Sequence, residues 1–303
     1  MPTATSLVLD DGTVVVLQSV IAPAHTDIPR AAEPDAARRD TERDDAASKL
    51  RWPMVEAAHA QVAGLTRGRN VTVAFTRRRA DRYGRRLAHV WLRKAGGSKA
   101  WLQQRLLELG LARFAPDRER TACARRLAKA ETRGRAAARG LWGLSAYRVR
   151  RADRPWQLRR YRNTYQVVAG RIMSANLSRG RLYLNFGREW RRDFTAVISK
   201  KQLAYFDRSP IDPRTLAGKT VEVRGWIESR GGPLISVEHT HQLALIDSKG
   251  GLAARLRHGR RSVQRAKARD RRRSQDERRK RRSPDATPPL IPNVPPEPGA
   301  LDL

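Results

Sequence analysis

The sequence contains a single cysteine, Cys123, and no apolar run long enough to cross a membrane. A single cysteine excludes an intramolecular disulfide and a metal site built from several thiolates. Because a transmembrane helix needs about 20 mostly apolar residues, the sequence predicts no transmembrane segment. The N-terminus lacks the features of a secretory signal, so the chain as written is expected to be cytoplasmic. A start further upstream would instead suit a periplasmic or secreted protein.

Acidic residues are scarce relative to basic ones. The 303 residues include 63 lysines and arginines but only 30 aspartates and glutamates, which gives a formal net charge of +33. Such a chain is attracted to polyanions, because binding releases the counterions that surround them. Nucleic acid, either DNA or RNA, is therefore the leading partner class, and anionic lipid surfaces come second. A compositional bias toward arginine is the competing explanation, but the basic residues occur in blocks.

The first half of the sequence predicts a small strand-rich domain, residues 6–147. Asp10-Asp11-Gly12-Thr13 lies between two β-branched runs, so residues 6–22 are expected to form a β-hairpin. Apolar spacing predicts further elements, with helices at 52–65, 99–109 and 117–139 and strands at 71–75 and 87–92. This order fits a five-stranded barrel of the OB type with covering helices. Residues 24–50 are polar and are expected to form an inserted surface loop.

The second half predicts another β-rich domain, residues 163–247, joined to the first by a basic linker at 148–162. Five short segments alternate between apolar and polar residues, at 166–172, 181–186, 194–198, 220–227 and 233–237. Strands of this length and number are typical of a small OB-like β-barrel. The sequence therefore predicts a β-rich α+β protein with two barrels.

Residues 251–303 lack the large apolar residues of a folded domain. Between Arg255 and Arg282 there are fifteen lysines and arginines and three acids, and Pro284–Leu303 is rich in proline. Such a segment cannot bury enough apolar surface to offset the entropy of ordering it, so we expect a disordered tail. Its composition fits an arm that binds phosphates or other anionic surfaces, and it also fits a solubilising tail.

Three motifs resemble those of the staphylococcal nuclease (thermonuclease) family. Asp81–Leu92 reads Asp-Arg-Tyr-Gly-Arg-Arg-Leu-Ala-His-Val-Trp-Leu and resembles the family signature Asp-x-Tyr-Gly-Arg-x-Leu-Ala. Leu107–Arg113 resembles the end of a family helix, and Gly140–Trp142 resembles the family's closing segment. The resemblance covers roughly residues 14–147 and implies a thermonuclease-like OB barrel with covering helices. The second half resembles the C-terminal extension of some bacterial members.

The resemblance also implies where an active site would lie. In the family, carboxylates hold Ca²⁺, a glutamate beside a proline orients water, and two arginines contact the phosphate. When the chain is aligned on Pro23, a family arginine falls on Val16, an aspartate on Ile21 and the glutamate on Ala24, and all three residues are apolar here. Only Arg85 is retained as a candidate catalytic residue. We therefore expect a degenerate site without a metal or other cofactor.

Acidic residues in the inserted loop leave an alternative open, because one of them could replace a missing ligand. They are Asp27, Glu33, Asp35, Glu42, Asp44 and Asp45. The favoured prediction is a nucleic-acid-binding protein with lost or impaired phosphodiester hydrolysis. The first alternative is an active, sugar-nonspecific endonuclease with a rearranged Ca²⁺ site, and the second is a protein-interaction scaffold.

Two basic segments with aromatic residues are predicted to bind nucleic acid. They supply Arg82, Tyr83, Arg85, Arg188, Trp190, Arg191 and Arg192. Guanidinium groups bind phosphates, and an aromatic ring can stack on an unpaired base. In the competing interpretation, the arginines are only solvated surface charges. Trp190 would then be buried between the two barrels. Asp81 is expected to order its own loop by accepting backbone N–H groups.

Overall fold

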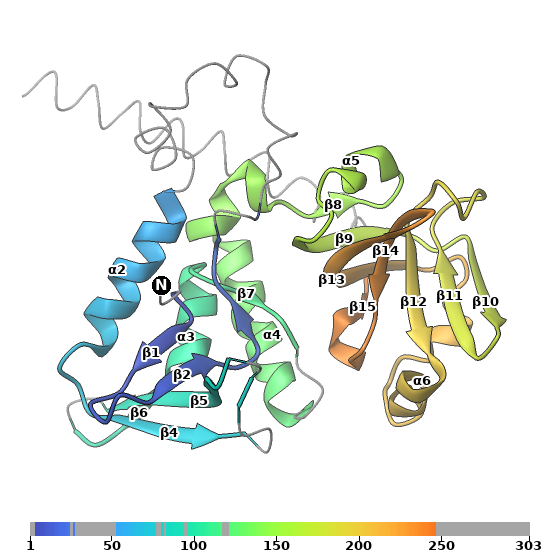
Figure 1. The fold of residues 1–303 in the computed structure, drawn as a ribbon. Coiled ribbons are helices and arrows are strands. Elements are labelled where there is room, and N and C mark those ends of the chain that lie inside the picture. Colours follow the sequence, from blue (N-terminus) through green and yellow to red (C-terminus); the bar gives the residue numbers. More distant parts are fainter. Residues whose placement is uncertain are drawn as a thin grey trace, which may run out of the picture. The chain divides into compact units, whose positions relative to one another are not determined.

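The computed structural model describes residues 4–24, 27, 53–76, 80–81, 83–93, 96–116 and 121–246. These residues all belong to one compact unit, Met1–Val263. They form a mixed α+β fold that is rich in strands (Figure 1). The expected tail at 251–303 and most of the expected loop at 24–50 lie outside the described residues.

The first sheet has five strands in the order β1-β2-β5-β4, with β6 paired to β5. They are β1 (Ser6–Val8), β2 (Val14–Leu17), β4 (Val71–Phe75), β5 (Arg86–Arg93) and β6 (Lys99–Trp101). β1 pairs antiparallel to β2 with Val8 opposite Val14, which confirms the predicted hairpin. β2 runs parallel to β5, with Val16 opposite Leu87. This pairing places β2 beside the start of β5, directly after Arg85.

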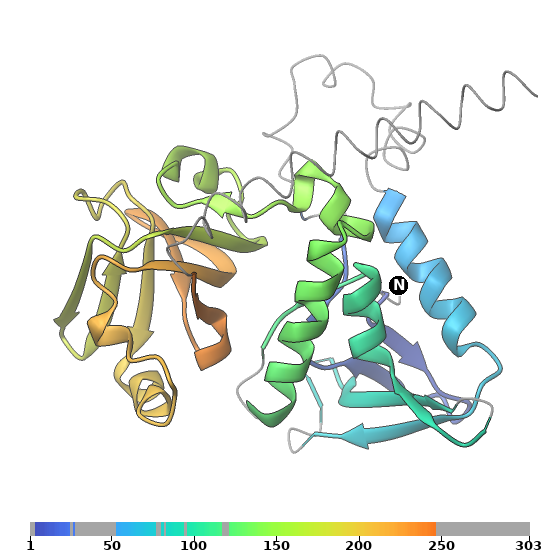
Figure 2. The same cartoon turned by 180° about the vertical axis from the view of Figure 1, so that it is seen from behind.

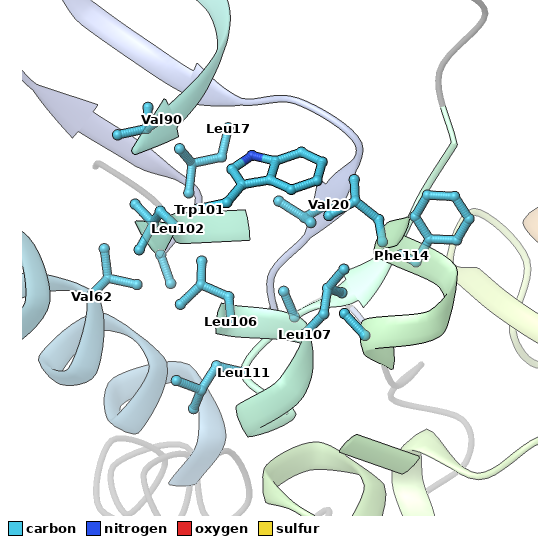
Figure 3. Packing of buried hydrophobic residues seen from close by; sticks show 14 of the residues in the cluster. Leu17, Val20, Val62, Val90, Trp101, Leu102, Leu106, Leu107, Leu111 and Phe114 are labelled. Atoms are coloured by element: carbon cyan, nitrogen blue, oxygen red, sulfur yellow. The ribbon is translucent and has the colours of Figure 1, made fainter. Parts of the chain in front are cut away.

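Three helices form where apolar spacing predicts them, but Lys99–Trp101, expected to begin the second helix, is strand β6. The helices are α2 (Pro53–Thr66), α3 (Leu102–Leu109) and α4 (Thr121–Ala136). Their apolar residues pack with those of the first sheet around Leu102, Leu106 and Phe114, each of which is fully buried (Figure 3). α3 ends at Gly110, which adopts a left-handed conformation with φ of 67°. Of the helices described, none is long and apolar enough to span a membrane.

Helices α3 and α4 lie side by side, and both views of the fold show this (Figure 2). Gly134 makes the close approach possible. A Cβ atom at this position would lie 2.3 Å from the carbonyl oxygen of Leu107. A glycine in a helix costs stability relative to alanine, but here it removes a clash with the neighbouring helix.

Short elements connect the first sheet to the rest of the unit. β3 (Val20–Ile21) pairs antiparallel to β7 (Arg113–Phe114). Two 3-10 turns, η3 (Gly140–Gly143) and η4 (Ser145–Tyr147), follow α4. Their apolar residues form a small buried cluster with Val149 and Val167.

The second sheet has eight strands in the order β10-β11-β12-β14-β13-β9-β8, with β15 paired to β13. The strands are β8 (Arg150–Arg151), β9 (Tyr165–Arg171), β10 (Ser174–Ser178), β11 (Arg181–Asn185), β12 (Thr195–Ser199), β13 (Thr220–Arg230), β14 (Gly232–Ser236) and β15 (Leu243–Leu245). Five of them match the predicted strands, whereas β8, β10 and β15 were not predicted. The pairing of the described strands leaves β10 and β8 at two ends, so it does not establish a closed barrel.

The remaining helical elements of this half are short. They are α5 (Pro155–Arg159), α6 (Lys200–Phe206), η5 (Pro213–Thr215) and η6 (Thr240–Gln242). The segment expected to be a linker, residues 148–162, contains β8 and α5. Leu158 is fully buried in the core of the second sheet. Arg150 is also buried, and its guanidinium carbon lies 4.0 Å from the ring centre of Tyr161. Because the segment is rich in arginine, its sequence did not predict that it packs against apolar residues.

Three buried charged side chains and the partly buried Arg135 join α4 to β13. Arg224 contacts Glu131 and Glu222 at 2.7 Å each, and Arg135 contacts Glu222 at 2.7 Å and Glu131 at 3.3 Å. Arg224 also donates a hydrogen bond to the carbonyl oxygen of Phe114 at 3.1 Å. Burial disfavours the charged guanidinium, but the attraction of both carboxylates outweighs burial and raises the pKa of Arg224.

We expect Arg224→Leu to lower the free energy of unfolding by about 3–5 kcal/mol, because it leaves two buried carboxylates, Glu131 and Glu222, with only Arg135 to balance them. Arg214 provides a matched control, since it also contacts two carboxylates, those of Asp207 and Asp212, but is exposed. Arg214→Leu should cost less than about 1 kcal/mol. Urea unfolding of both variants measures the difference, and equal losses would contradict the prediction.

Candidate nucleic-acid interface

Asp81 organises the signature loop that precedes β5. Its Oδ1 atom accepts hydrogen bonds from the backbone N–H groups of Tyr83 at 2.9 Å and Arg85 at 3.0 Å. The backbone of Asp81 is bonded to Arg85 and Gly84 as well, and Gly84 has a φ of 73° that favours glycine. These bonds confirm that Asp81 orders its own loop.

The same carboxylate also holds the Arg85 side chain. Asp81 Oδ2 lies 2.8 Å from Arg85 Nε and 2.7 Å from Nη2. The hydrogen bond from Arg85 is the main reason that the pKa of Asp81 lies below its ordinary value. The Arg85 side chain is still 37% exposed, and its guanidinium carbon lies 5.2 Å from the ring centre of Tyr83. Tyr83 is exposed, and Arg82 lies outside the described residues.

The residues at the three family positions, Val16, Ile21 and Ala24, are apolar and half-buried. Val16 lies opposite Leu87 in the first sheet, and Ile21 lies opposite Arg113 in the small sheet. Together with Ala24 they supply no side-chain oxygen, whereas Ca²⁺ needs six or more oxygen ligands. These residues therefore do not fit a Ca²⁺ site of the kind that the family resemblance implies.

Asp27 is the one acid of the expected loop that the structure describes. It is buried, and its Oδ2 atom lies 2.9 Å from Arg113 Nη2 and accepts a hydrogen bond from the Ala24 N–H at 3.0 Å. The carboxylate is thus already paired with a buried arginine. Across the described ranges, no three His, Cys, Asp or Glu side chains come together as a metal-binding group. The other five acids of the loop lie outside the described residues.

The second predicted segment is a compact loop between β11 and β12. Asp193 accepts a hydrogen bond from the Glu189 N–H at 2.8 Å, and Arg192 lies 3.6 Å from the Glu189 carboxylate. Trp190 is 57% exposed, and the guanidinium carbon of Arg191 lies 4.7 Å from its ring centre. Burial of Trp190 between two barrels is therefore wrong for the described structure. Arg188 is exposed in the same loop.

Trp190 lies beside a cavity of about 800 Å³ on the second sheet, and sequence analysis missed most of its lining. The missed residues include Tyr183 and three arginines, Arg179, Arg181 and Arg230. They come from different elements, so no single segment identifies them. The alternation along β11 could have identified part of the lining. Leu182 and Leu184 are buried, so the residues that alternate with them lie on the opposite face of the sheet.

We expect Arg85→Gln to raise the pKa of Asp81 toward its ordinary value, because the substitution removes the main cause of its lowering. In the native protein the ion pair should persist at neutral pH and be lost as the pH falls through the folded-state pKa of Asp81. NMR titration of the carboxyl carbons measures both. Asp11 is the control, because a hydrogen bond from Thr13 lowers its pKa and should remain. Equal changes at both carboxylates would contradict the role of Arg85.

Comparison with known proteins agrees with the sequence motifs. Residues 24–143 match the family model described as staphylococcal nuclease homologue. The match contains the signature loop, the end of α3 and the Gly140–Trp142 segment. No curated protein matches the chain. Residues 24–143 therefore form a domain of the staphylococcal nuclease homologue family.

Proposed function

We propose that this protein binds nucleic acid and that its nuclease-homologue domain contacts the phosphate backbone through the signature loop. The observation that carries the proposal is the partly exposed guanidinium of Arg85, which Asp81 orients beside the exposed ring of Tyr83. An arginine held in this way can donate to a phosphate at a lower entropic cost than a free one. The net charge of +33 supplies long-range attraction to the same ligand.

We further propose that hydrolysis is lost or impaired. Hydrolysis by the mechanism of the family depends on a metal ion that polarises the phosphate and on an oriented water. The apolar residues Ile21 and Ala24 support the proposal, because they offer neither a metal ligand nor a base, and Val16 offers no cation for the phosphate. The pairing of Asp27 with Arg113 supports it too, because it occupies the one acid of the expected loop that the structure describes.

Binding to duplex DNA should weaken steeply as the salt concentration rises. Engagement of roughly six phosphates corresponds to a log–log slope of about −5. Arg85→Ala should reduce the magnitude of that slope by about one, because one phosphate contact is lost. Arg93→Ala is the control. Arg93 is exposed at the far end of β5, and its substitution removes the same charge. Fluorescence anisotropy over a salt series measures the slopes, and identical slopes for both variants would show that Arg85 does not contact phosphate.

The purified protein should not degrade plasmid DNA or RNA faster in Ca²⁺ than in a chelator. The reason is the missing carboxylates, so Arg85→Ala should leave this background unchanged. Gel assays of both nucleic acids with both proteins provide the test. Cleavage that requires Ca²⁺ and disappears in Arg85→Ala would refute the loss of activity. It would establish the endonuclease alternative instead.

A further inference from the structure

One face of the second sheet forms a concave polar surface around the 800 Å³ cavity. The strand register places Asn176 opposite Tyr183, Tyr183 opposite Val197, and Val197 opposite Ser236. All four residues line the cavity, so one row of side chains crosses four strands. The residues between them point into the core, as the burial of Leu182 and Leu184 shows.

The charges that line this cavity are unbalanced. Arg179, Arg181 and Arg230 are the cations of the lining, and Glu238 is its only acid. None of the three arginines forms an ion pair with a carboxylate of the described residues, whereas exposed Arg214 elsewhere in this half contacts two. Three guanidinium groups around one hollow create a positive potential inside it, which favours an anionic ligand.

The lining also offers aromatic and hydrogen-bonding groups. Trp190 and Tyr183 both reach the cavity, and Trp190 is more than half exposed. Asn185 donates to the Ser174 hydroxyl at 3.1 Å and accepts from the Thr195 hydroxyl at 3.2 Å. Amides and hydroxyls that are fixed in this way can serve as both donors and acceptors toward a ligand.

We propose that this cavity binds single-stranded nucleic acid. The arginines would contact phosphates, the rings of Trp190 and Tyr183 would stack on bases, and the polar row that includes Asn176 would contact base edges. Duplex DNA does not fit this set of groups, because its bases stack on one another and do not offer their faces. The inference rests on the proposed function in taking nucleic acid as the ligand, but it assigns a separate surface.

The test compares the full-length protein with Trp190→Ala, Tyr183→Ala and Arg181→Gln for binding a labelled single strand and the duplex of the same sequence. The loss of one base stack should weaken single-strand binding about 5- to 150-fold, and duplex binding should change far less. Arg181→Gln should weaken single-strand binding and reduce its salt dependence. Trp156→Ala and Arg160→Gln are the controls, because both residues are exposed and lie outside the cavity.

The possible outcomes separate this inference from the proposed function. If the native protein binds duplex and single strands but the three cavity variants match the controls, the cavity assignment is wrong and the proposed function stands. If the native protein binds neither ligand, the proposed function fails as well. An earlier thermal unfolding of Trp190→Ala together with normal binding by Arg181→Gln would also overturn the assignment. Competition by a mononucleotide as strong as that by the oligonucleotide would indicate a small-molecule site.

Discussion

The buried charge of Arg224 is the constraint on which much of the architecture depends. An unpaired guanidinium in a protein interior costs several kcal/mol, so the fold must deliver compensating groups to it. Glu222 comes from the same strand, but Glu131 comes from α4, 93 residues away in the sequence. The carbonyl of Phe114 in β7 completes the set. Strand β13 and helix α4 therefore stabilise each other, which is consistent with their place in one compact unit.

This dependence changes how the chain should be divided. Sequence analysis predicted two barrels with a basic linker at 148–162, as if each could form alone. A fragment that contained β13 without α4 would leave Arg224 and Glu222 without two of their partners, Glu131 and Arg135. Leu158 and Arg150 extend the packing into the supposed linker. The division into two independent barrels remains a prediction, and the buried contacts argue against it.

The shortage of acids explains how carboxylates are used in this chain. Asp27 pairs with Arg113, and Glu131 and Glu222 pair with Arg135 and Arg224, all in the interior. In each of these pairs, the carboxylate offsets the free-energy cost of burying the arginine. A chain with twice as many bases as acids has few carboxylates left for other tasks. Consequently, unpaired arginines gather on surfaces such as the cavity of the second sheet.

Short-range patterns in the sequence predicted much of the fold. Features that depend on contacts between distant residues could not be predicted in this way. The turn at Asp10–Thr13, the helix at α2 and five strands of the second sheet follow from short-range periodicity. β10 escaped because Ser174–Ser178 is short and mostly polar, with Leu177 as its one large apolar residue, and no residue of it is buried. It pairs with β11 along its whole length. The signature motif identified Arg85, and mixed charge and aromaticity identified Trp190. Arg179 and Arg230 could not be found, because only the folded sheet brings them to one cavity.

The hydrogen bonds that orient Arg85 come from its own turn. Asp81 supplies the acceptors for the N–H groups of Tyr83, Gly84 and Arg85 and for the guanidinium, so these bonds involve neither β2 nor β3. The arginine therefore remains in place whatever residues occupy positions 16, 21 and 24. A turn of this kind makes the orientation of Arg85, the proposed phosphate contact, independent of whether carboxylates occupy these positions. It also makes this domain a natural scaffold for engineering, because carboxylates introduced on the neighbouring strands would meet an arginine that is already oriented.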